Sequence, residues 1–197
     1  MGFSITRMPI YAGKVYRMFL RSMYRFDRWH LYTLRERIYA QDIIRFCNNR
    51  PVRNSFVEIG CGLGDIIRNV NYGSKLGLDH DKAVVGAAAV MNRLALRPGM
   101  SFGTFSFPGS VLDGRYDVIV MVNWIHAFSP EALAEGMNGY FRNNLNPGGV
   151  LIIDTVQDPE YRYNHDIGFL TRNLDCRVEK IGDYERQRSV WAIHKKE

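Results

Sequence analysis

The chain has 197 residues, of which 46% are hydrophobic and 13% aromatic. This composition is that of a globular protein, and the length suffices for one α/β domain with a short additional segment. No apolar run approaches the roughly 20 residues that cross a bilayer, and we expect no secretory signal. The net charge is +6, and residues 1–57 alone carry eleven Lys or Arg against three acids, net +8.

Three cysteines occur, Cys47, Cys61 and Cys176. Their odd number and their spacing fit neither a disulfide framework nor a set of metal ligands. We therefore expect a cytoplasmic protein without a metal site. Cys61 lies inside a glycine-rich turn and has no identifiable basic partner that would activate its thiol, so we interpret it as a small structural residue of that turn.

The first fifty residues are predicted to form a helical lid or cap on a larger domain at 51–197. Five cations recur at steps of three or four residues over 11–29 and would line one helical face: Lys14, Arg17, Arg21, Arg25 and Arg28. Such a face suits solvent, a peripheral contact with an anionic membrane, nucleic acid or an acidic substrate. A second helical run covers 31–48 and is stopped by Pro51.

A glycine-rich turn and a downstream acid indicate a nucleotide-like ligand. Gly60, Gly62 and Gly64 form a Gly-x-Gly-x-Gly pattern directly after a short apolar strand. Glycine lets bare backbone approach a ligand, close to helix-terminal N–H groups. Asp79 ends the next predicted strand, 19 residues after Gly60. An acid at about that distance accepts hydrogen bonds from ribose hydroxyls in nucleotide-binding βαβ units.

The spacing of the glycines separates two nucleotide ligands. The dinucleotide fingerprint requires glycine at position 65, where this chain has Asp65, so an NAD-dependent oxidoreductase is a disfavoured alternative. With Glu58 two residues before the first glycine, the turn resembles the first motif of class I S-adenosylmethionine (SAM) dependent methyltransferases, acid-x-Gly-x-Gly-x-Gly. A Leu-x-Pro-Gly-Gly turn at 145–149 is a second similarity, and the resemblance extends over 55–194.

The resemblance implies a Rossmann-like, doubly wound α/β fold with a seven-stranded, mostly parallel sheet, an antiparallel final strand inserted beside the fifth, and N-terminal helices. Residue patterns predict a matching succession of elements. We expect strands at 55–59, 75–79, 100–105, 116–122, 150–155, 177–181 and 189–194, with helices at 65–70, 81–96, 129–145 and 165–174.

The resemblance also implies where SAM would bind. The backbone of the glycine turn approaches the methionine part, Glu58 helps to orient that part, and Asp79 takes the ribose hydroxyls. We expect these cofactor-binding residues: Glu58, Gly60, Cys61, Gly62, Gly64, Asp79, His80 and Asn123.

The contacts to adenine stay open. The family usually places an Asp soon after the third strand, but this chain has no acid there until Asp113. Ser106 or Ser110 could supply a hydrogen bond instead, and Phe107 could pack on the ring.

Methyl transfer is an in-line displacement, and methylation of a hydroxyl needs a general base. Histidine titrates nearest to neutrality. His126, after the fourth strand, and His165, after the fifth, are the candidate catalytic residues. For each, the alternative is a structural polar residue of its turn.

The sequence predicts an enzyme that methylates a small molecule or glycan, preferably at oxygen. Methyltransferases that act on base amines carry Asn/Asp-Pro-Pro-aromatic after the fourth strand, whereas this chain has Asn-Trp-Ile-His at 123–126. The basic N-terminus keeps RNA as an alternative acceptor. A non-catalytic, methyltransferase-like subunit that binds a partner is a further alternative, and the sequence does not define the oligomeric state.

Overall fold

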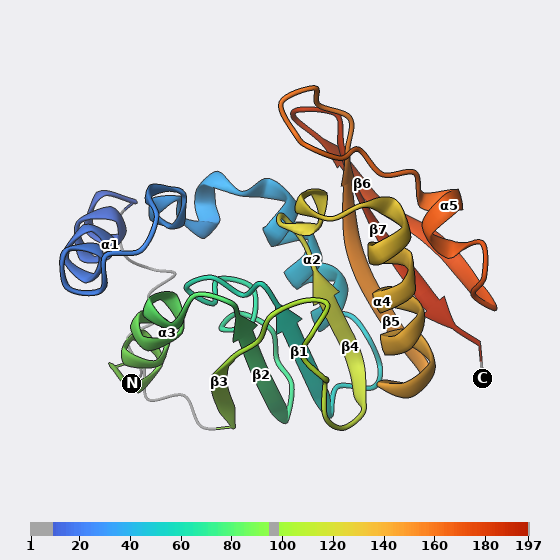
Figure 1. Cartoon of the computed structure of the whole chain (residues 1–197). Coiled ribbons are helices and arrows are strands. Elements are labelled where there is room, and N and C mark those ends of the chain that lie inside the picture. The colour runs from blue at the N-terminus through green and yellow to red at the C-terminus, as the bar shows by residue number, and fades with distance from the viewer. Residues whose placement is uncertain (1–9, 95–98, 197) are drawn as a thin grey trace.

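The computed structural model describes residues 10–94 and 99–196 (Figure 1). Within this part of the chain, seven strands form one sheet in the order β3-β2-β1-β4-β5-β7-β6. β1 to β5 pair in parallel, whereas β7 is antiparallel to both β5 and β6. The strands are β1 (Ser55–Ile59), β2 (Ser74–Asp79), β3 (Met100–Thr104), β4 (Tyr116–Met121), β5 (Leu145–Val156), β6 (Cys176–Tyr184) and β7 (Arg188–Lys195). The predicted sheet, with an antiparallel final strand beside the fifth, is confirmed.

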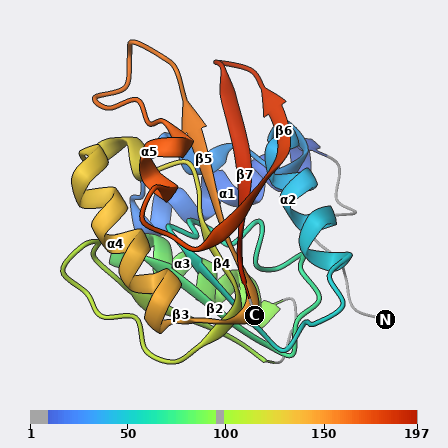
Figure 2. The ribbon, with the colours of Figure 1, turned by 90° about the vertical axis from the view of Figure 1, so that its right-hand side faces the viewer.

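The central strands are apolar on both sides because helices cover both faces of the sheet. Along β4, Val118 and Val120 belong to the hydrophobic cluster that includes α2 (Ile38–Asn48), whereas Ile119 and Met121 belong to the cluster that includes α4 (Pro130–Asn143). Figure 2 shows these two helices on opposite sides of the strands. The predicted doubly wound fold is therefore confirmed.

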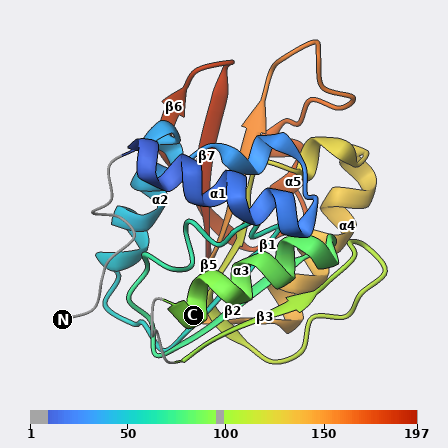
Figure 3. The same ribbon diagram turned by 90° about the vertical axis from the view of Figure 1, so that its left-hand side faces the viewer.

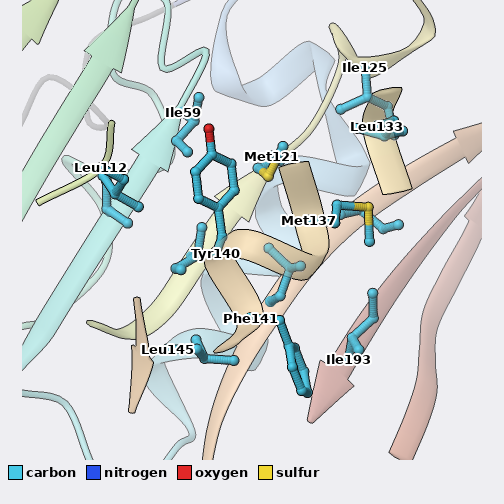
Figure 4. Close-up of a cluster of buried hydrophobic side chains, with 14 of the residues drawn as sticks. Ile59, Leu112, Met121, Ile125, Leu133, Met137, Tyr140, Phe141, Leu145 and Ile193 are labelled. Atoms are coloured by element: carbon cyan, nitrogen blue, oxygen red, sulfur yellow. The ribbon is translucent and has the colours of Figure 1, made fainter. Parts of the chain in front are cut away.

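The layer between α4 and the sheet is built from large side chains. Met137, Tyr140 and Phe141 of α4 meet strand residues such as Met121 and Ile193 (Figure 4). α4 begins where the sequence predicts, because the Ser129 hydroxyl accepts a hydrogen bond from the Ala132 N–H, and Pro130 takes the first helical position. This layer holds the segment after β4 in place above the sheet.

Two predicted N-terminal helices are shorter than expected. α1 (Ile10–Tyr24) ends five residues early because Arg25 adopts a left-handed φ of 61°. The second run becomes helical only at Ile38. Before it lie two short 3-10 turns, at Arg28–Leu31 and Leu34–Glu36; a capping box between Thr33 and Glu36 fixes the second.

The predicted helix at 65–70 is wrong, since the chain forms a series of turns there. The Ile67 N–H donates to the Glu58 carboxylate at 2.9 Å instead of to a helix carbonyl. The helix predicted at 165–174 is confined to α5 (Ile167–Thr171), and α3 (Lys82–Leu94) lies within its expected range. The 145–149 turn is part of β5, where the pairing with β4 is irregular.

The five cations predicted to line one face over 11–29 are only partly exposed: Arg25 and Arg28 face solvent, whereas α1 directs Arg17 and Arg21 toward the protein. Arg17 is 4% exposed and donates from Nη2 to Asp65 Oδ1 at 2.5 Å; its Nη1 donates to the His30 and Tyr32 carbonyl oxygens. The Arg21 side chain donates to the Phe26 carbonyl. α1 is thereby locked to the loop that follows β1.

α1 lies along α3, as Figure 3 shows. Leu20 and Phe26 join Met91 in one buried cluster, with Tyr24 packed against it. Gly86 makes this approach feasible, since a Cβ there would lie 2.9 Å from the Tyr24 ring.

We use the name cap segment for residues 10–37. The division into residues 1–50 and 51–197 stays a prediction. α2, within the first of these ranges, packs into the core of the sheet through Ile43 and Cys47. Among the described helices, none combines the length and the apolar character needed to cross a membrane.

Asp65 is the anchor of the cap segment. It is 7% exposed, and three guanidinium groups surround it: Arg17 at 2.5 Å, Arg37 at 3.6 Å and Arg68 at 3.7 Å. Burial favours the protonated acid, but Arg17, followed by the other two, outweighs burial and holds the pKa of Asp65 below its ordinary value. The buried carboxylate thus depends on cations from both the cap segment and the loop.

Replacing Arg17 with alanine is expected to lower the free energy of unfolding by about 3 kcal/mol, since it leaves a buried carboxylate with weaker partners. Urea denaturation measures the change. Arg28→Ala is the matched control, because Arg28 is exposed, and its effect should stay within about 0.5 kcal/mol. A loss below about 1 kcal/mol for Arg17→Ala would contradict the anchoring role.

Candidate functional site

Four neighbouring strands end around one hollow of about 340 Å³. β1 and β2 lead to Gly60 and Asp79, and the segments after β3 and β4 supply Phe107 and Trp124. The carboxyl ends of parallel strands are where open α/β sheets bind ligands, and the volume lies in the range of ligand pockets. The full lining is Trp29, Ile59, Gly60, Asp79, His80, Phe105, Ser106, Phe107, Trp124, Ala127 and Phe128.

A second, smaller hollow of about 20 Å³ lies on the other side of the glycine turn. It shares Gly60 and Trp29 with the larger one. Its lining is more polar and includes Arg37 from the cap segment. The other lining residues are Tyr39, Ala40, Glu58, Cys61, Gly62, Asp65, Ile66, Val122 and Asn123.

The glycine turn needs glycine for conformation and for space. Gly60, Gly62 and Gly64 have φ values of +77°, +54° and +78°. L-residues with side chains rarely adopt this region. A Cβ on Gly60 would lie 2.1 Å from a carbon of the Trp124 indole, and one on Gly62 would lie 3.0 Å from His30 Nδ1. The turn is therefore closely covered by side chains from the segment after β4 and from the cap segment.

Asp79 is the carboxylate that joins the glycine turn to β2. Its Oδ2 accepts from the Gly62 N–H at 2.8 Å, and its Oδ1 accepts from the Asp81 N–H at 3.1 Å. A carboxylate has about four acceptor sites, so two remain for further donors. His80 lies beside it, with Nδ1 3.3 Å from Oδ1, and its side chain is 80% exposed. Both predicted residues line the larger hollow.

The Trp124 indole covers the junction of the two hollows. Its Nε1 donates to the Ile59 carbonyl at 2.6 Å, which holds the ring over Gly60. The Phe107 and Phe128 rings lie 5.4 and 5.7 Å from the indole, centroid to centroid. These three rings form an aromatic wall.

Glu58 and Cys61 are buried beneath the turn. Glu58 is 4% exposed, and burial raises its pKa to about 8 despite the hydrogen bond from the Ile67 N–H. Burial likewise raises the pKa of the Cys61 thiol. A buried thiol of raised pKa is a poor nucleophile, which supports the structural interpretation of Cys61.

Asn123 lines the smaller hollow. It belongs to a polar network at the ends of β4, β5 and β7. It has a φ of +69°, which asparagine tolerates better than other residues with side chains. Its N–H donates to Asp154 Oδ1 at 2.8 Å, and its Oδ1 accepts from Arg188 Nη2 at 3.1 Å. Arg188 also forms a buried ion pair with Asp154. The structure thus brings Asn123 together with the glycine turn.

His126 and His165 lie beside the site but line neither hollow. Burial, followed by the charges of Arg188 and His165, lowers the pKa of His126 to about 4. Burial also lowers the pKa of His165, whose Nε2 lies 3.1 Å from the Ile125 carbonyl oxygen. In both rings Nδ1 is buried without a hydrogen-bond partner in the described part of the chain. A catalytic role for either stays a prediction.

The sequence predicts a lid from the first fifty residues but does not single out Trp29 and Arg37, the residues of the cap segment that line the two hollows. Trp29 and Arg37 come from short turns far along the chain from the glycines, and no local motif marks them. Of the residues that the sequence offers for contact with adenine, Ser106 and Phe107 line the larger hollow. The contact itself stays a prediction. Ser110 instead accepts a hydrogen bond from the Ser106 N–H through its hydroxyl.

The sheet order and the site at the ends of β1, β2 and β4 define the fold of class I SAM-dependent methyltransferases. The solved structure of the N-methyltransferase NodS from Bradyrhizobium japonicum WM9 in complex with S-adenosyl-L-homocysteine matches with a TM-score of 0.72 at 16% identity, over 92% of this chain and 99% of that one. Magnesium protoporphyrin IX methyltransferase (ChlM) from Synechocystis PCC 6803, solved with bound SAM, gives 0.66 at 14%, over 87% and 86%.

A SAM-dependent methyltransferase from Clostridium acetobutylicum ATCC 824 gives a TM-score of 0.64 at 12% identity, over 94% of this chain and 99% of that one. At such identities the likeness establishes the fold. A scan against models of protein families finds no match, and a search of curated proteins finds none either.

Proposed function

We propose that the protein is a SAM-dependent methyltransferase whose cofactor lies across the two hollows. The observation that carries this proposal is the position of Asp79. Its carboxylate closes the glycine turn and also forms part of the wall of the aromatic hollow. In a ligand whose vicinal ribose hydroxyls bind Asp79, the nucleobase would lie in the aromatic hollow and the opposite end would lie against the glycine turn.

The larger hollow suits adenosine. The rings of Phe105, Phe107 and Phe128 offer apolar surface to a planar base, and Ser106 is the polar residue beside them. The two free acceptor sites of Asp79 match the two ribose hydroxyls. His80 lies at the rim, where it would contact the sugar or the base.

The smaller hollow has the polar lining that the amino-acid end of the cofactor needs, but its volume of about 20 Å³ holds little more than one water. Its walls must therefore move apart when that end enters. Arg37 lines this hollow, its side chain is 18% exposed, and its guanidinium group pairs well with a carboxylate. Glu58, with a pKa of about 8, is largely protonated at neutral pH and adds no full negative charge there. Cys61 and Asn123 complete the wall.

Bound SAM would supply an activated methyl group for in-line displacement. The chain's own task is then to position the acceptor and to exclude water. The lowered pKa values leave His126 and His165 uncharged at neutral pH, but a lowered pKa also makes each a weaker proton acceptor than an ordinary histidine. His126 packs against Tyr161, in the segment after β5, at a ring distance of 4.0 Å.

We further propose that the acceptor is a small molecule or glycan methylated at oxygen in the cytoplasm. The support is the segment after β4, where Asn123 is followed by Trp124 instead of two prolines. Its backbone leads into a 3-10 turn (Ile125–Ala127).

Asp79→Ala is expected to weaken the binding of S-adenosylhomocysteine by about 1–3 kcal/mol, because it removes charge-assisted hydrogen bonds to two hydroxyls. Isothermal titration calorimetry measures the change. Asp79→Asn tests charge while keeping an acceptor for the Gly62 N–H, and Asp113→Ala is a control outside both hollows. Unchanged affinity in folded Asp79 variants would refute the ribose assignment.

Trp124→Phe is expected to tighten the binding of S-adenosylhomocysteine roughly two- to tenfold, because it removes the hydrogen bond that holds the indole over Gly60. The matched control is Trp191→Phe, since the Trp191 indole donates to Thr155 and lines neither hollow. Weaker binding by Trp124→Phe would contradict this, since it would show that the indole stabilises the bound cofactor where it lies.

Incubation with methyl-labelled SAM tests the acceptor class. Label is expected in the small-molecule or glycan fraction of a cell extract and absent when Asp79→Ala protein replaces the wild type. Label in RNA alone would overturn the acceptor proposal but leave the cofactor proposal intact. Absence of label from every fraction, together with tight cofactor binding, would favour a non-catalytic binding subunit.

A further inference from the structure

α1 presents an apolar face to solvent. Val15, Met18, Phe19 and Met23 are 65%, 60%, 60% and 61% exposed. They recur at steps of three, one and four residues, so they share one side of the helix. We call these four residues the apolar α1 face. Side chains of this size and exposure, gathered on one helix, mark an interaction surface.

The packing of α1 prevents this face from turning inward. On the opposite side of the helix, Leu20 is buried against α3 and Arg17 is paired with Asp65. Figure 3 shows α1 beside α3. A rotation that hid Phe19 would break the buried ion pair and leave Asp65 with its two more distant partners.

The surroundings of the apolar α1 face are basic. The cap segment contains seven Lys or Arg and two acids, net +5, although Arg17 and Arg37 pair with Asp65 and Lys14 pairs with Glu36. α1 itself contains no acid. Arg25 and Arg28, just beyond the end of α1, are exposed. Trp29 and Tyr32 follow, 39% and 55% exposed. Aromatic side chains with one polar atom suit the level of lipid headgroups.

We propose that the apolar α1 face docks the protein on an anionic lipid surface. Phe19, Met18 and their neighbours enter the boundary of the acyl chains, while Arg25 and Arg28 contact acidic headgroups. An amphipathic helix with aromatic and aliphatic residues on one side and cations around it binds membranes in this manner. Charge complementarity favours lipid over a second copy of this chain, whose corresponding face carries the same positive charge.

Flotation of the full-length protein with vesicles tests the proposal. The protein is expected to float with vesicles of phosphatidylcholine and phosphatidylserine, weakly with phosphatidylcholine alone, and less as salt is raised. Phe19→Asp is expected to lower the partition coefficient about tenfold or more, since it removes a phenyl group that enters the lipid and adds a negative charge. Its melting temperature and its affinity for S-adenosylhomocysteine should stay unchanged.

Val111→Asp is the matched control, because Val111 is 84% exposed in the loop between β3 and β4, outside the cap segment. It should float like the wild type. The proposal is overturned if the wild type fails to float with acidic vesicles or if Phe19→Asp floats equally well. It is also overturned if light scattering shows a dimer that Phe19→Asp dissociates while vesicle binding is absent.

Discussion

The hydrogen bonds that fold the glycine turn onto the end of β2 are the constraint on which the site depends. The Gly60 and Cys61 N–H groups both donate to the Leu78 carbonyl, at 2.7 and 2.9 Å, and the Gly62 N–H donates to Asp79. These bonds require the positive φ values that glycine provides. They bring backbone and carboxylate together, and they leave a hollow whose remaining walls come from β3, β4 and the cap segment.

The cap segment is attached to this turn through charge. Arg17 pairs with Asp65, the residue that follows the last glycine of the turn, and this ion pair positions α1. The chain that follows α1 then places Trp29 and Arg37 in the walls of the two hollows. The same attachment decides which side of α1 meets solvent. One buried carboxylate therefore links the proposed cofactor site to the proposed lipid surface, although each proposal has its own test.

Sequence reasoning predicted the sheet well because its signals are local. Apolar runs, the glycine spacing and the acid at the end of β2 each act within a few residues. The burial of Arg17 in α1 could not be predicted in this way, because periodicity identifies the faces of a helix but not which face is buried. The buried partner of Arg17 is Asp65, 48 residues away in the chain. At 65–70, the Glu58 carboxylate took the Ile67 N–H that a helix would have used.

Titration of the wild-type protein with S-adenosylhomocysteine in a calorimeter tests the central claim most directly. We expect saturable binding of one ligand per chain with a Kd well below about 1 mM, and no comparable binding of NADH. Absence of binding at millimolar ligand, or binding of NADH in its place, would contradict the account.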